Sequence, residues 1–184
     1  AARRIKEAGA KSFNKGYLPS WGKIPYPATI CTSVNEEASH APPSGRLLDE
    51  GDIVTYDLGV RFGSACGDAA ITVAVGEINN RKDRLMRYAQ RALEIGIEQV
   101  KAGASISAIG EAIEDYASLH GYSIVKDFGG HAIGREMHED PHIPSYHDKR
   151  YDSVFLKEGQ VICIEPTLTP GSGKVGILGT DKWT

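Results

Sequence analysis

Two aspartates, eleven residues apart, stand in stretches that alternate between apolar and polar side chains. Residues 52–60 and 68–76 each show the period of two that is typical of a β-strand, and they contain Asp57 and Asp68. A hairpin that turns at Phe62 and Gly63 would place the two carboxylates directly opposite each other. Like charges in that position repel unless a cation lies between them, which predicts a metal site; the alternative is that both aspartates face solvent.

Glu165 and His131 could add ligands to this site. Glu165 lies in the apolar run VICIEPTL, where an ionised carboxylate requires a partner, although a place at the end of a strand beside Pro166 would also explain it. His131 follows Gly129 and Gly130, which let the backbone approach a site closely, although a lone histidine is more often structural. Carboxylates from three strands combined with one imidazole suit hard or borderline divalent metals.

Strands and two helices must position these residues. The loop NEEASHAPPSG carries His40, while residues 127–148 are rich in glycine and histidine and show no periodicity. A first helical periodicity begins at Asn80, the predicted N-cap, and ends before Gly103. A second one ends before Gly121. The predicted elements are strands at 30–34, 52–60, 68–76 and 161–168 and amphipathic helices at 80–103 and 105–120.

The composition describes one soluble globular domain. The chain has 184 residues, 41% of them hydrophobic and 24% charged, with a net charge of -3. Its pI near 6.1 leaves no positive field that would attract nucleic acid or anionic lipid. Because neither a membrane-spanning apolar run nor a secretion signal is visible, we expect a cytoplasmic protein. The three widely spaced cysteines are expected to be reduced thiols.

Five motifs follow one another in the order YDLG, GDAA, GGHAIG, MHEDP and CIEP. Together they resemble the type I methionine aminopeptidases, over residues 24–184. The resemblance implies the α+β pita-bread (creatinase-like) fold, a central antiparallel sheet with helices packed on its outer face. It also implies a dinuclear site of two divalent metal ions, which could be Co, Mn, Fe, Zn or Ni. The implied ligands are Asp57, Asp68, His131 and Glu165, and a fifth, a glutamate from a later strand, has no counterpart in this sequence.

The resemblance also implies roles for further residues. His40 would contact the peptide near the scissile bond, His138 would contact the carbonyl oxygen in the transition state, and Glu165 would carry a proton from water to the leaving amine. The residues that would line the pocket for the methionine side chain are Tyr26, Cys31, Met137 and Trp183. The sequence departs from the usual family pattern at Ser39, Ala41, Pro42, Ala132 and Met137.

The activity implied by the resemblance is removal of the initiator methionine from nascent proteins. Its partners would be N-terminal methionine peptides and the ribosome, without a membrane or sequence-specific nucleic acid, and we expect a monomer. Residues 1–184 are expected to be a single metallopeptidase catalytic domain that lacks its N-terminal and C-terminal segments. Two alternatives stay open. One is an aminopeptidase P or prolidase, which share the fold and ligand order, and the other is a non-catalytic pita-bread protein that binds partners.

Overall fold

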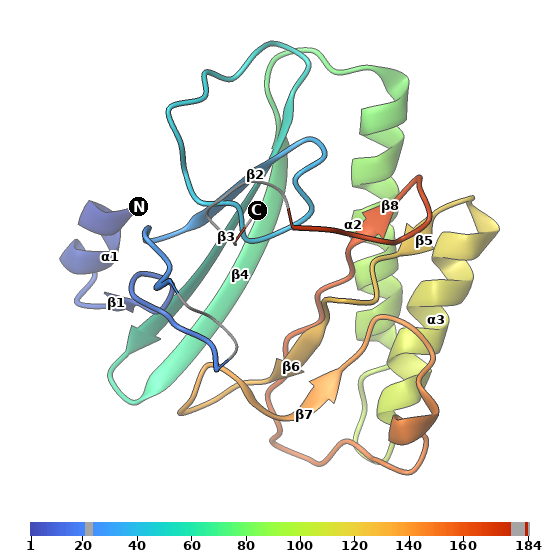
Figure 1. The fold of residues 1–184 in the computed structure, drawn as a ribbon. Coiled ribbons are helices and arrows are strands. Elements are labelled where there is room, and N and C mark those ends of the chain that lie inside the picture. The colour runs from blue at the N-terminus through green and yellow to red at the C-terminus, as the bar shows by residue number, and fades with distance from the viewer. Residues whose placement is uncertain (21–23, 178–182, 184) are drawn as a thin grey trace. The chain divides into compact units, whose positions relative to one another are not determined.

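The structure is a computed structural model in which residues 1–20, 24–177 and 183 are described. The chain forms two compact units (Figure 1). Unit 1 comprises Ala1–Asn79, Gly134–Met137 and Gly176–Thr184, and unit 2 comprises Asn80–Ile133 and His138–Val175. None of the described helices combines the length and the apolar character that a membrane span needs.

Unit 1 is built on an antiparallel sheet. Its central strand β3 (Ile53–Phe62) pairs along one edge with β4 (Ala65–Ala74). Along its other edge β3 pairs with β2 (Cys31–Val34) and with β1 (Lys11–Ser12), which follows a short helix α1 (Ala2–Glu7). The strands predicted at 30–34, 52–60 and 68–76 are confirmed, and His40 lies in the loop between β2 and β3, as predicted.

The turn of the β3–β4 hairpin lies at Gly63 and Ser64, one residue later than predicted. Gly63 has a φ of +58°, a conformation that glycine adopts without strain at the first position of a two-residue hairpin turn. Phe62 therefore pairs with Ala65. A turn that moves by one residue shifts every partner across the hairpin by two.

This shift changes how the two aspartates meet. Asp57 pairs with Ala70, and Asp68 pairs with Gly59. The prediction that Asp57 lies directly opposite Asp68 is therefore wrong, because glycine fixed the turn one position further along the chain. Since the displacement is two residues, both carboxylates stay on one face of the hairpin as diagonal neighbours, a spacing across which charges still interact.

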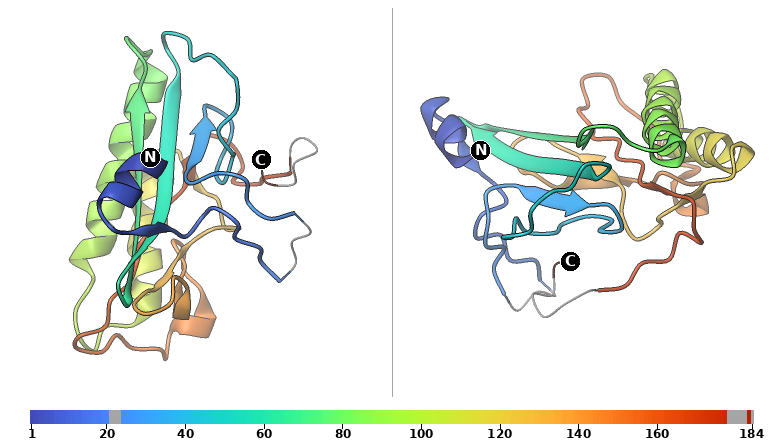
Figure 2. Two further views of the ribbon diagram at one scale, coloured as in Figure 1. Left: turned by 90° about the vertical axis from the view of Figure 1, so that its left-hand side faces the viewer. Right: turned by 90° about the horizontal axis from the view of Figure 1, so that it is seen from above.

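Two helices lie side by side in unit 2, as Figures 1 and 2 show: α2 (Asn80–Glu98) and α3 (Ile106–Leu119). Both predicted helices are confirmed. The first ends before the predicted limit near Gly103, because the amides of Gln99 and Val100 already bond to carbonyls three residues back and tighten the last turn. Asn80 is the first residue of α2 itself, where we predicted the N-cap.

The hydrophobic core of unit 2 forms around α3. Its apolar residues at three- and four-residue spacing are fully buried, as the periodicity of the sequence predicts. Ser105 caps the helix by accepting a hydrogen bond from the amide of Ser107, and Gly121 follows its end with a φ of +77°. The core residues are Ala92, Ile106, Ile109, Ile113, Ala117, Ile124, Ile143, Leu156 and Leu168.

The remaining strands of unit 2 are short and form two ladders. One joins β6 (Gly130–Ala132) to β7 (Glu139–Ile143), and the other joins β5 (Ser123–Ile124) to β8 (Leu168–Thr169). The short 3-10 helix η1 (Lys149–Tyr151) lies between β7 and β8 in the chain. The structure is therefore mixed, with antiparallel strands and helices, which agrees with the predicted α+β class.

Two expectations about this part of the chain need correction. Residues 127–148, which show no periodicity, contain the β6–β7 ladder, because a three-residue strand interrupted by a bulge is too short to produce a pattern. The predicted strand at 161–168 is regular only at its end, in β8. Its first part pairs with β6 through a single bridge between Ile162 and Ala132. A longer ladder does not form through Pro166, because proline has no amide proton to donate.

The packing of α3 makes a testable prediction at Gly110. A Cβ added there would come within 2.2 Å of the backbone oxygen of Tyr146. We expect Gly110→Ala to lower the free energy of unfolding by at least about 2 kcal/mol, since backbone has to move to make room. Urea denaturation measures the change. Glu111→Ala, on the exposed side of the same helix, should stay within about 0.5 kcal/mol, and equal stabilities of the two variants would contradict the packing.

Candidate metal centre and substrate pocket

The pair Asp57 and Asp68 concentrates negative charge on one face of the β3–β4 hairpin. Both residues are half-buried. Burial, reinforced by the negative charge of Asp68, raises the pKa of Asp57 to about 6. Cys31, the partner of Asp57 in β2, donates a thiol hydrogen bond to this carboxylate. Two carboxylates that are partly removed from water and lie near each other favour a cation between them.

The pair His131 and Glu165 lies within unit 2. His131 is 8% exposed, and its Nε2 is 3.4 Å from an oxygen of Glu165. Its Nδ1 lies 3.0 Å from the carbonyl oxygen of Ala132, which can only accept, so Nδ1 carries the proton. In the neutral ring, Nε2 then presents a lone pair to a carboxylate. A cation between these two atoms would satisfy both, and a histidine held through its other nitrogen is the usual arrangement of a metal ligand.

Close backbone contact fixes the distance between these two ligands. A Cβ on Gly130 would come within 1.9 Å of the carbonyl oxygen of Cys163, so only glycine allows the segment that carries Glu165 to lie against β6. The amide of Cys163 donates a 2.7 Å hydrogen bond to the carbonyl of His131. Glycine beside the histidine therefore has a specific structural purpose.

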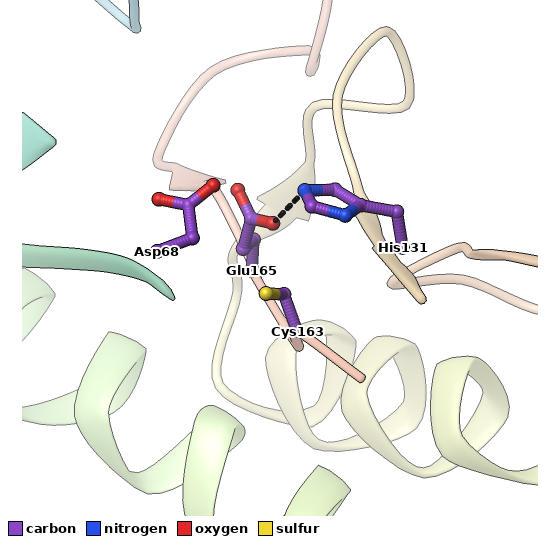
Figure 3. A group of neighbouring side chains, drawn as sticks. All are labelled: Asp68, His131, Cys163 and Glu165. Carbon is purple, nitrogen blue, oxygen red and sulfur yellow. Dashed lines mark ion pairs between the residues drawn. The ribbon is translucent and has the colours of Figure 1, made fainter. Parts of the chain in front are cut away.

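A third donor in unit 2 was not among the predicted site residues. The sulfur of Cys163, a ring nitrogen of His131 and a carboxylate oxygen of Glu165 lie within 4.8 Å of one another (Figure 3). The sequence carried a signal for it, because alternate residues of an extended segment project to the same side and Cys163 precedes Glu165 by two positions.

The predicted pocket residues Tyr26, Cys31 and Trp183 gather next to Asp57 in unit 1. Tyr26 is 3% exposed, donates its hydroxyl to the carbonyl of Ala41 at 3.1 Å, and meets the Trp183 ring edge-on with 5.0 Å between ring centroids. The thiol of Cys31 also makes a hydrogen bond with Tyr26. Burial raises the pKa of the Cys31 thiol to about 12. Because it stays protonated at neutral pH, this thiol contributes soft apolar surface rather than a nucleophile.

Met137 belongs to the same unit and is 2% exposed. Its thioether packs on Gly59 so closely that a Cβ there would lie 2.7 Å from the terminal methyl carbon. Since Gly59 is the cross-strand partner of Asp68, Met137 contacts the part of the hairpin that carries the aspartates.

The two predicted substrate-contacting histidines are both exposed. His40 has a φ of +62° and precedes Ala41, whose carbonyl accepts hydrogen bonds from the hydroxyl of Tyr26 and the amide of Thr32. His138 precedes β7 in unit 2, and its ring centroid lies 4.6 Å from that of His131. In unit 2 the structure thus brings His138 beside the predicted ligand His131.

Comparison with known proteins identifies the family of this chain. The model of metallopeptidase family M24 matches residues 2–181. The methionine aminopeptidase of Mycoplasma capricolum is 38% identical over 98% of this chain and 69% of its own length. Methionine aminopeptidase 1 of Bacillus subtilis is 38% identical over 100% of this chain and 71% of its own length. The chain belongs to the methionine aminopeptidase family.

Solved structures place this family member in the pita-bread fold. The methionine aminopeptidase of Thermotoga maritima superposes with a TM-score of 0.89 at 34% identity and covers 98% of this chain and 70% of its own. The prolidase of Pyrococcus furiosus gives a TM-score of 0.66 at 27% identity over 74% of this chain and 40% of its own. The fold is therefore shared with the prolidases, whereas the match over almost the whole chain is to methionine aminopeptidases.

Family membership identifies the chain as a metallopeptidase, a hydrolase that depends on divalent metal ions. The residues present fit such ions on chemical grounds. Unit 1 offers two carboxylates, and burial together with the charge of Asp68 raises the pKa of Asp57. Unit 2 offers an imidazole nitrogen that faces a carboxylate. Mixed oxygen and nitrogen donors of this kind suit borderline divalent cations.

The close contact at Gly130 leads to a prediction about metal affinity. We expect Gly130→Ala to weaken metal binding at least about tenfold, since displacing the Glu165 segment disturbs the spacing of the ligands. Isothermal titration calorimetry with Mn²⁺ measures it. Gly67→Ala is the matched control, because a Cβ there meets nothing nearer than a Val60 methyl at 3.9 Å. Equal affinities of the two variants would contradict the proposed role of the contact.

The raised pKa of Asp57 leads to a prediction about stability. The pKa of Asp57 is raised from an ordinary value of 3.8 to about 6 in the folded chain. The contribution of Asp57 to the free energy of unfolding is therefore fully present below pH 3.8 and is lost as pH rises through 6. In metal-free protein at pH 7, Asp57→Asn should therefore raise the free energy of unfolding by about 1–3 kcal/mol. The gain should disappear near pH 4.

Thermal denaturation in chelator and in excess Mn²⁺ tests this prediction. With metal present the sign should reverse, because the variant lacks a ligand that stabilises the folded state. Asp115→Asn, at an exposed position on α3, should change little in either condition. If Asp57→Asn instead destabilises the protein in chelator at pH 7, the charge of the Asp57 carboxylate is stabilised by the protein itself without a cation, which contradicts the prediction.

Proposed function

We propose that the chain forms a dinuclear metal centre that removes N-terminal methionine from proteins. Its proposed ligands are Asp57, Asp68, His131 and Glu165, and residues 1–184 belong to a single metallopeptidase catalytic domain. The metals are two divalent ions from the set Co, Mn, Fe, Zn and Ni. The observation that supports this most directly is the Nε2 of His131 facing the Glu165 carboxylate at 3.4 Å, while Nδ1 is occupied by a backbone carbonyl.

The chemistry that divalent cations supply when bound is polarisation of the scissile carbonyl and acidification of the attacking water. Glu165, whose side chain is 44% exposed, takes the proton of that water and passes it to the leaving amine. His138 donates a hydrogen bond to the negative charge that develops on the carbonyl oxygen. His40 contacts the peptide beside the scissile bond and orients it for attack.

A pocket in unit 1 holds the methionine side chain of the substrate. The proposed pocket residues supply a thiol, a thioether and two aromatic rings, which are polarisable groups that suit a thioether better than a charged or hydrogen-bonding group. The residues are Tyr26, Cys31, Met137 and Trp183. The substrates are then the N-terminal methionine peptides of nascent proteins, met at the ribosome in the cytoplasm by a monomeric enzyme.

Peptide hydrolysis by the full-length protein tests this function. With Mn²⁺ or Co²⁺ present, Met-Ala-Ser should release free methionine, whereas dipeptides with proline in second place should not be cleaved. Glu165→Gln should bind peptide yet release almost none. Preferred cleavage before proline would assign a prolidase instead. Absence of both activities, with no metal retained, would assign a non-catalytic binding protein.

The role of His138 predicts a specific kinetic effect. We expect His138→Ala to lower kcat about 100-fold while KM changes by less than about threefold, because the contact is made mainly to charge in the transition state. His147→Ala is the matched control, since His147 lies in the same unit and its Nε2 faces Asp152 at 3.1 Å. A loss confined to KM would reassign His138 to ground-state binding.

A further inference from the structure

We propose that the sulfur of Cys163 is an additional metal ligand, beside His131 and Glu165. This inference rests on the proposed metal centre and adds a soft donor to an oxygen and nitrogen set. All three residues belong to unit 2, and each offers a donor atom within 4.8 Å of the other two (Figure 3).

The spacing of the three donors is close to that of a coordination sphere. Bonds of about 2.0–2.3 Å from a tetrahedral metal to nitrogen, oxygen and sulfur place neighbouring donors roughly 3.5 Å apart. His131 and Glu165 already have this spacing, at 3.4 Å. The sulfur of Cys163 lies within 4.8 Å of the other two donors, so it has to move closer to them by little more than about 1 Å at most. Rotation about the χ1 angle of Cys163 can supply this movement.

The backbone holds Cys163 in register with the other two ligands. Its amide donates to the carbonyl of His131 at 2.7 Å, and its own carbonyl lies against Gly130. Two positions further along, Glu165 projects from the same segment. The Cα of Cys163 is therefore held beside His131, and rotation about χ1 is the motion that brings the sulfur toward the imidazole. Rigid backbone around a donor is what a preorganised ligand requires.

A sulfur ligand changes which metals the site prefers. On coordination the S–H bond breaks, a sulfur–metal bond forms, and the proton leaves to the buffer. Thiolate favours the borderline and soft ions Co²⁺, Zn²⁺ and Cd²⁺ over Mn²⁺ and Mg²⁺, which prefer oxygen. The side chain at position 163 would thus set metal selectivity without taking part in the peptide chemistry.

Electronic absorption of the cobalt-substituted full-length protein tests the proposal independently of activity. We expect an intense sulfur-to-cobalt charge-transfer band in the near ultraviolet that Cys163→Ser abolishes while cobalt stays bound. Cys163→Ser should also weaken Cd²⁺ binding by at least about tenfold and leave Mn²⁺ binding nearly unchanged. Cys66→Ser is the matched control, because that thiol donates to the carbonyl of Arg135 at 3.4 Å, and it should keep the band.

The outcomes separate this inference from the proposed function. Stoichiometric cobalt binding without a charge-transfer band would overturn the sulfur ligand and leave the metal centre standing. A band that survives Cys163→Ser but disappears in Cys31→Ser would assign the sulfur to the thiol beside Asp57, which also overturns it. Failure of the wild-type protein to bind cobalt at all would contradict both the ligand and the metal centre.

Discussion

Repulsion between donors that the backbone holds close together is the constraint on which the site depends. Backbone hydrogen bonds of the β3–β4 hairpin keep Asp57 and Asp68 on one face, where burial and the neighbouring charge raise the pKa of Asp57 to about 6. A structure that holds like charges together in partial isolation from water has to offset that cost elsewhere. In the proposed metal centre divalent cations would offset it, and their binding energy would then contribute to the stability of the fold.

A close backbone contact at Gly130 positions the donors of unit 2. Gly130 lets the Glu165 segment approach β6 so closely that no side chain fits between them, and the carbonyl of Ala132 fixes the tautomer of His131. Sequence, backbone contact and ring orientation thus lead to one result, a nitrogen lone pair aimed at a carboxylate. Two of the proposed pocket residues depend on the sheet of unit 1: Cys31 pairs with Asp57 across β2 and β3, and Met137 packs on Gly59 of β3.

Much of this arrangement could be predicted from the residues, and the failures have physical causes. Period-two alternation predicted β3 and β4, and apolar spacing predicted α2 and α3, because long elements repeat their pattern many times. The register of the hairpin depended on a single residue, Gly63, and was missed by one position. The β6–β7 ladder and the donor Cys163 arise from contacts between distant segments, which leave little local pattern. The metal ligands and pocket residues were assigned through motif resemblance, since chemistry alone left solvated alternatives open.

Anomalous diffraction from crystals of the full-length protein grown with Mn²⁺ tests the proposed metal centre most directly. We expect anomalous peaks within about 2.0–2.3 Å of carboxylate oxygens of Asp57, Asp68 and Glu165 and of Nε2 of His131. The proposed metal centre requires all four residues to share that density. Peaks bound elsewhere, or a centre in which either the aspartates or the His131–Glu165 pair is left without metal, would contradict it.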